Sequence, residues 1–203
     1  MIEARIFIEG KVQDTEKSGA DENFLSKLIS TRNVNLSHTL KFVGLGGKDI
    51  DKFEKNIPNF IDKNSSGKNL IIIDADEDNI QERRTEITAF LNANNIVAEI
   101  YFFPNNSGSG ELEDLLFSCI PDDKRAYLNC FSSFEECISS SGQLPPDKKD
   151  KLHIYCSSFL NTNERTHRGK FVYPLGNFFD ARFFNVNSPS LDNLVNFLIQ
   201  HLA

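Results

Sequence analysis

Residues 70–76 read Leu-Ile-Ile-Ile-Asp-Ala-Asp, and this stretch decides the fold. An unbroken run of large aliphatic residues suits a strand that is covered on both faces, as in the middle of a parallel sheet. Two carboxylates, Asp74 and Asp76, follow the run directly. Because they are two residues apart, an extended backbone aims both side chains to the same side.

Strands and helices are predicted to alternate on either side of this stretch. Apolar runs predict further strands at residues 5–8, 39–43 and 98–103, and helical periodicity predicts helices at 21–32, 49–62 and 80–94. Pro58 is expected to bend the second of these helices. Repeated strand–helix units imply right-handed crossovers, so we predict an α/β fold with a parallel sheet.

The chain changes character after Pro104. A loop rich in Asn, Ser and Gly leads into a helix start at 111–116 that is rich in acids. Further helices are predicted at 123–139, 147–160 and 190–202, whereas 161–170 and 174–188 look irregular. We expect residues 1–120 to form the α/β core and residues 121–203 to form a mainly helical extension packed on it.

The composition is that of an acidic folded protein. The 203 residues carry a net charge of −7, so a basic footprint for nucleic acid over the whole chain is absent. A bound metal ion or a local basic strip can still hold a phosphate backbone on an acidic protein. The chain has 18 phenylalanines and no tryptophan, and we expect most of these rings in the core.

The four cysteines point to a reducing compartment. None of them forms a C-x-x-C pair, which disfavours a zinc ribbon. Residues 1–10 read as a folded strand rather than as a signal peptide, so we expect a cytoplasmic protein with free thiols. No apolar run approaches the ~18–20 residues of a membrane span, so no membrane partner is expected.

Acidic residues are predicted to meet at one edge of the sheet. Glu9 ends the first strand, and Asp74 and Asp76 end the third. Ligands of open α/β sheets bind beyond the carboxyl ends of the strands. Oxygen ligands from several carboxylates suit Mg²⁺ or Mn²⁺, and carboxylates packed closely repel one another unless a cation or a proton intervenes.

Each part of this pattern also has a simpler explanation. Acids that follow a strand often cap the next helix, and Asp78 could be such a cap. Gly46 and Gly47 do not belong to a P-loop, and a strand-to-helix turn is the ordinary interpretation, although their amides could meet a phosphate. The combination of Glu9 with Asp74 and Asp76 is stronger evidence than any of its parts.

Two sequence motifs resemble the Toprim domain of primases, topoisomerases and overcoming-lysogenization-defect nucleases. They are Phe-Ile-Glu-Gly-Lys at 7–11 and the stretch at 70–76, which match a glutamate after the first strand and a D-x-D after the third. The loop at 104–110 with Leu-Glu-Asp-Leu-Leu at 112–116 resembles a narrower group of small bacterial Toprim-like proteins. The resemblance implies a three-layer, Rossmann-like sandwich with four parallel strands in the order 2-1-3-4.

The resemblance also implies roles for individual residues. Glu9 would act as general acid or base, and Asp74, Asp76 and Glu113 would bind Mg²⁺ or Mn²⁺. Relatives of the nuclease type use a downstream lysine, for which Lys148, Lys151 and Lys170 are available and Lys151 is our candidate. The additional acids are Asp14, Asp21 and Asp78, and the candidate phosphate-binding residues are Lys11, Gly46 and Gly47.

Three functions remain open at this point. The first is a metal-dependent nuclease with DNA or RNA as its partner. The second is a non-catalytic Toprim-like module that binds metal, nucleotide or a partner protein, which the acidic net charge favours. The third is a scaffold whose acids only cap helices. The sequence predicts no oligomeric state.

Overall fold

Four parallel strands form the centre of the protein. The computed structural model describes residues 2–10, 20–76, 79–160, 166–167, 170–171 and 179–203. The strands are β1 (Ile2–Ile8), β2 (His38–Gly44), β3 (Lys68–Asp74) and β4 (Glu99–Phe103). Their order is β2-β1-β3-β4 and every neighbouring pair is parallel, which confirms the predicted α/β fold and strand order.

The helices follow the predicted pattern closely. They are α1 (Ala20–Thr31), α2 (Ile50–Lys55), α3 (Ile80–Ala93), α4 (Leu112–Ser118), α5 (Ala126–Ser140), α6 (Lys148–Ser158) and α8 (Asp192–Leu202). The helix predicted at 49–62 is too long, since α2 ends at Lys55 and Pro58 lies in a separate 3-10 turn, Ile57–Asn59. The region predicted as irregular also contains a short antiparallel pair, β5 (Thr166–His167) and β6 (Lys170–Phe171).

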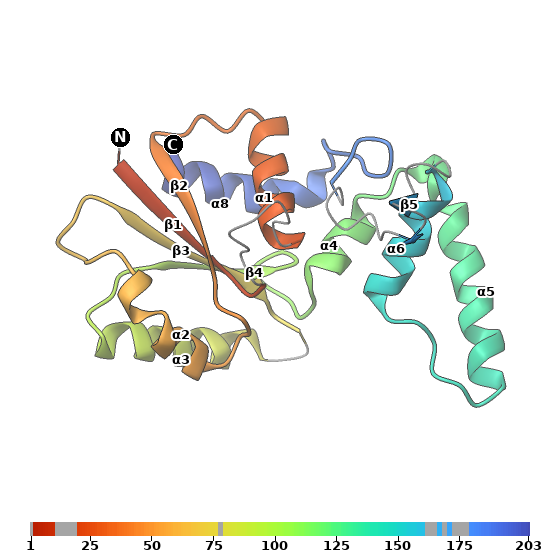
Figure 1. The fold of residues 1–203 in the computed structure, drawn as a ribbon, viewed down its shortest axis with the longest axis horizontal. Helices are drawn as coiled ribbons and strands as arrows, with labels where there is room; N and C mark the ends of the chain where they lie inside the picture. Colours follow the sequence, from red (N-terminus) through yellow and green to blue (C-terminus); the bar gives the residue numbers. More distant parts are fainter. Residues whose placement is uncertain (1, 11–19, 77–78, 161–165, 168–169, 172–178) are drawn as a thin grey trace.

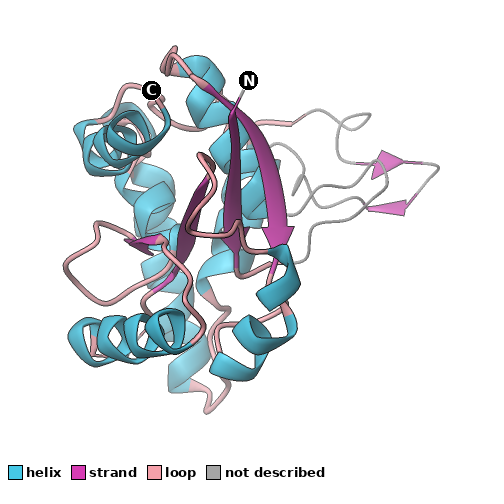
Figure 2. Ribbon diagram, turned by 90° about the vertical axis from the view of Figure 1, so that its left-hand side faces the viewer, coloured by secondary structure: helices cyan, strands magenta, loops and turns pink. Residues whose placement is uncertain are grey.

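Helices α1 and α8 cover one face of the sheet and α2 and α3 cover the other, whereas α4, α5 and α6 lie beyond its carboxyl edge (Figures 1 and 2). Ile6 and Ile8 of β1 pack toward α1 and α8, whereas Phe7 between them packs toward α2 and α3. The residues at 70–73 are almost completely buried, as expected for a strand that is covered on both faces. None of the described helices is long and apolar enough to cross a membrane.

The carboxyl ends of the strands meet at one edge. Ile8 is paired with Gly44 on one side and with Ile72 on the other, and Asp74 is paired with Phe103. Figure 1 shows β1 running from the N-terminus toward α4, with α6 and α5 farther out in the same direction. The end of β3 therefore lies beside the start of α4, where the N–H of Leu112 donates to Asp74.

Candidate functional site

Five carboxylates gather where the strands end. Glu9 follows β1, Asp74 and Asp76 lie at the end of β3 and just after it, and Asp21 and Glu113 lie in the first turns of α1 and α4. The charges of Glu9, Asp21 and Glu113 all raise the pKa of Asp74, and the charge of Asp76 raises the pKa of Glu9. We call these five residues the acidic cluster.

Asp74 lies at the centre of the acidic cluster. Burial is the main reason why its pKa rises to about 8, and the neighbouring carboxylates add to the rise. Its Oδ1 atom accepts a hydrogen bond of 2.8 Å from the backbone N–H of Leu112, which favours the ionised form. This bond connects the end of β3 to the first residue of α4.

Glu9 has an unused acceptor in a buried position. Burial raises its pKa first, followed by the charges of Asp76 and Asp21, while the ammonium of Lys48 opposes the rise. Its Oε2 atom is shielded from solvent and has no hydrogen-bond partner within the described part of the chain. A buried carboxylate oxygen without a partner is costly, so a proton or a cation is expected to satisfy it.

Asp76 is held in a backbone conformation that is rare for residues other than glycine. Its φ is 51°, and its backbone exchanges hydrogen bonds of 2.8 and 2.7 Å with Gly110. Gly110 has a φ of 134°, and a Cβ atom there would lie 2.7 Å from Oδ2 of Asp114. The Asp76 carboxylate pairs with Nζ of Lys48 at 2.5 Å.

Asp21 joins the acidic cluster through the backbone that follows β1. Its Oδ2 atom accepts a 3.1 Å hydrogen bond from the N–H of Gly10, and a Cβ atom at Gly10 would lie equally close to that oxygen. Burial raises the pKa of Asp21, and the charge of Lys149 opposes the rise. Among the additional acids named from the sequence, Asp21 lies in the acidic cluster.

Glu113 and Asp114 are neighbours with separate tasks. Burial raises the pKa of Glu113, as do the charges of Glu111 and Asp21, while Lys149 opposes the rise. Asp114 instead accepts from the N–H of Glu111 at 2.9 Å and pairs with Lys148 at 2.7 Å. Glu113 therefore belongs to the acidic cluster, and Asp114 completes the N-terminal cap of α4.

The lysine beside the acids is not the one expected from the sequence. Lys151 pairs with Glu135 of α5, and Lys148 pairs with Asp114 and Glu111. Lys149 is exposed, and its charge acts on Asp21 and Glu113. Lys151, the lysine chosen from the sequence, is therefore engaged by Glu135, and its role in the site stays a prediction. Lys149 is a second candidate, because its charge acts on two of the acids.

The glycines after β2 support Glu9 instead of a phosphate. The N–H groups of Gly46 and Gly47 donate to the carbonyl oxygen of Glu9 at 3.0 and 3.1 Å. Both amides are therefore engaged within the protein, and the phosphate-binding role expected for them stays a prediction. Lys48 follows these glycines directly, a position from which the sequence predicted no role.

Three of the expected residues cannot be placed. Lys11 and Asp14 lie in the segment 11–19, and Asp78 lies in the segment 77–78, both outside the described residues. Helix α3 is capped by Asn79, whose side chain accepts from the N–H of Gln81. Asp74 and Asp76 therefore do not cap the helix that follows them, although Asp74 does bond to the start of α4.

The carboxylates fit a divalent cation in their chemistry. Within the described residues, no three His, Cys, Asp or Glu side chains converge closely enough to hold a metal ion with their present side-chain positions. The donor set nevertheless consists of oxygen atoms and includes the unpartnered Oε2 of Glu9, and a cation would reverse the rise in the pKa values of Glu9, Asp74 and Glu113. Asp74, Asp76 and Glu113, with Glu9 beside them, are the residues that would hold it.

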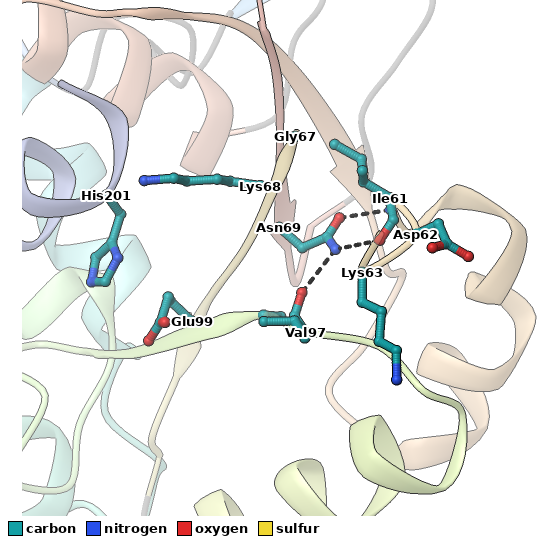
Figure 3. A pocket seen from close by; sticks show the side chains of 10 residues that line it. Ile61, Asp62, Lys63, Gly67, Lys68, Asn69, Val97, Glu99 and His201 are labelled. Atoms are coloured by element: carbon teal, nitrogen blue, oxygen red, sulfur yellow. Dashed lines mark hydrogen bonds between the residues drawn. The ribbon is translucent and has the colours of Figure 1, made fainter. Parts of the chain in front are cut away.

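A hollow lined largely by polar and charged residues lies at the opposite edge of the sheet. It measures about 210 Å³ and is bordered by Lys68, Glu99 and His201 (Figure 3). Asn69 lies behind it with its amide engaged by the backbone of Ile61 and Val97, so this side chain holds the strand starts together. The hollow lies at the amino ends of the strands, away from the acidic cluster.

Comparisons with known proteins identify a family without an assigned activity. No curated protein matches the chain, and no solved structure matches it. One family, described as "Protein of unknown function (DUF3226)", matches residues 17–202. Because this match spans nearly the whole sequence, the chain belongs to the DUF3226 family.

Proposed function

We propose that this protein is a Toprim-like, Mg²⁺- or Mn²⁺-dependent enzyme that cuts phosphodiester bonds in DNA or RNA. The observation that carries the proposal is the acidic cluster, in which four separate segments bring five carboxylates to the carboxyl edge of a parallel sheet. All five side chains are half-buried, and a protein gains no stability from like charges placed together where water only partly screens them. Such an arrangement is typical of a functional site that binds a cation when the protein is active.

Asp74, Asp76 and Glu113 are the proposed metal ligands. When bound, a divalent cation would lower the pKa of a coordinated water and polarise a phosphoryl oxygen. Asp74 is held by the N–H of Leu112, and Asp76 is held by its bridge to Gly110 and its pair with Lys48. These contacts restrain Asp74 and Asp76 at the sheet edge, and because no three described acidic side chains converge on one point, metal binding would require shifts of the side chains.

Glu9 and Lys149 supply the remaining chemistry. The buried Oε2 of Glu9 can take up a proton, and its raised pKa brings it closer to the working pH of a general base. Lys149 is an exposed cation beside Asp21 and Glu113, where it can bind a phosphate oxygen of the substrate. A metal ion at the acidic cluster and the ammonium of Lys149 beside it would together attract a polyanionic substrate.

A cleavage assay tests the proposal. Supercoiled plasmid, single-stranded DNA and RNA are each incubated with the protein in Mg²⁺, in Mn²⁺ and in EDTA. We expect cutting that requires metal and is lost in Asp74→Asn but kept in Asp51→Asn, which changes an exposed acid of α2. The proposal that this protein is a nuclease is refuted if none of the substrates is cut with either metal.

A non-catalytic Toprim-like module that binds metal, nucleotide or a partner protein is the second candidate. It is favoured by the net charge of −7, which does not suit a protein that holds a nucleic-acid backbone. This function predicts calorimetric binding of Mn²⁺ that is lost in Asp74→Asn, with no cleavage of any substrate. Binding and cleavage measured on the same preparation separate the two candidates.

We also propose a cytoplasmic location. Support comes from the four cysteines, all of which are free thiols. Fractionation of the native host, with antibody detection of the protein, tests this location.

A further inference from the structure

Helix α5 carries a second apolar stripe that stays largely exposed in the described structure, although Tyr127 at its start contacts the ring of Phe159 at 5.0 Å between centroids. One stripe, formed by Leu128, Phe131 and Ile138, is half-buried on the protein. The second stripe consists of Tyr127, Cys130, Phe134 and Cys137, and all four residues are exposed. None of the 15 residues of α5 is fully buried.

The spacing of the second stripe is that of a helix–helix seam. Its members are separated by three, four and three residues, the repeat with which two helices pack along their length. Tyr127 and Phe134 keep 45% and 48% of their surface exposed. A stripe of this length and exposure is unusual for a helix that faces only water.

The lack of charged residues beside the stripe favours a second copy of the chain as its partner. Ala126, Ser133 and Ser140 border its outer side, so no charge lies next to it there. Of the two acids of α5, Glu135 is paired with Lys151 of α6, and Glu136 lies on the opposite side of the helix. In a chain with a net charge of −7, this stripe is a place where two copies can meet without repulsion.

We infer that α5 is the self-association face of this protein, with the α5 helices of two copies packed antiparallel. Large and small residues alternate along the stripe, as Tyr127, Cys130, Phe134 and Cys137. An antiparallel pair sets each ring opposite a cysteine, which fills space evenly and permits sulfur–aromatic contact. A parallel pair would set ring against ring and thiol against thiol.

The position of α5 leaves room for a second copy. Figure 1 shows α5 at the outer end of the molecule, on the far side of α6 from the sheet. Leu144 and Ile154 are exposed beside it and line, with Phe134 and Ile138, the hollow between α5 and α6. These side chains extend the apolar surface beyond the helix itself.

The available surface sets the strength of the contact. A stable interface hides about 800 Å² on each partner, while α5 is only about 22 Å long. The stripe alone falls short of this area, and Leu144 and Ile154 supply part of the difference. We expect a dimer with a dissociation constant on the order of 10 µM, between weak and standard interfaces.

Sedimentation velocity from about 1 to 200 µM tests the inference, with the range set around the expected constant. The full-length protein should shift from monomer to dimer, and Phe134→Glu should weaken dimerisation at least about tenfold, since it puts a charge into the seam. Ile199→Glu is the matched control, because Ile199 of α8 is 45% exposed and lies elsewhere. It should leave dimerisation unchanged.

Cross-linking tests the orientation. In the antiparallel pair, the Cys130 thiols of the two copies lie about one helical turn apart along the axis, and the Cys137 thiols lie nearly three turns apart. A short bismaleimide should therefore cross-link Cys137→Ser but not Cys130→Ser. Cys119 and Cys156 are buried and contribute little background.

Three results would overturn the inference. They are a monomer at every concentration, a dimer that tolerates Phe134→Glu, and equal cross-linking of the two cysteine variants, which would indicate parallel packing. If the monomer instead sediments with phosphatidylcholine vesicles, the stripe belongs to a membrane surface and self-association is excluded.

Discussion

Replacing Asp74 by asparagine should stabilise the metal-free protein at alkaline pH. Asparagine keeps the shape of the side chain and an oxygen that can accept the 2.8 Å hydrogen bond from Leu112. It removes the charge that burial and the neighbouring acids disfavour. The substitution therefore separates the cost of the charge from the contribution of the hydrogen bond.

The magnitude follows from the pKa of Asp74. The folded value is about 8 and the ordinary value is 3.8, so between these limits the folded state keeps a proton that the unfolded state has lost. Stability then falls as the pH rises through this window. From pH 5 to 8 the full effect would be about 4 kcal/mol, at 1.36 kcal/mol per unit. Screening by nearby solvent reduces the expected loss to about 2 kcal/mol.

Urea unfolding followed by circular dichroism measures this loss. The wild type and Asp74→Asn are compared at pH 5, 6.5 and 8 in EDTA. We expect the variant to lose at least half of the pH dependence; part of it remains because Glu9, Asp21 and Glu113 also have raised pKa values. Equal slopes in the two proteins would refute the placement of Asp74 as a buried, crowded carboxylate.

Three further results are expected from the same structure. Mn²⁺ at a hundred times its dissociation constant should stabilise the wild type by about 2.7 kcal/mol in urea unfolding and leave Asp74→Asn unchanged; equal stabilisation of both would place the ion elsewhere. Lys149→Ala should slow metal-dependent cleavage at least about tenfold, while Lys151→Ala should not, and the reverse ranking in a plasmid assay would restore the lysine chosen from the sequence. Gly110→Ala should cost about 1–3 kcal/mol in thermal unfolding, because its φ of 134° and the 2.7 Å approach of Asp114 leave no room for a methyl group, and an unchanged melting temperature would contradict this.

The sheet was predictable because its signals are local. The aliphatic run at 70–73 needs cover on both faces wherever it lies, and the alternation of strands with helices then leaves few topologies. The end of α2 was less predictable. Pro58 lacks a backbone N–H donor and so disfavours a continuous helix, but its position does not determine how many of the preceding residues are non-helical.

The site was predictable only as far as strand ends determine it. Glu9 and Asp74 are placed by the sheet, whereas the choice between Lys149 and Lys151 depends on how α6 is rotated against α4. That rotation is set by contacts between distant segments, such as the pair of Lys148 with Asp114. Sequence spacing contains no information on such contacts.

The bridge between Asp76 and Gly110 has a consequence for the order of folding. The sheet is complete at Phe103, yet the conformation of Asp76 and the bond from Leu112 to Asp74 need the chain that comes afterwards. A nascent chain would thus possess its four strands before it possesses the acidic cluster. Under the proposed function, a truncated chain that lacks α4 would not bind metal ions, so metal binding would report that α4 has docked.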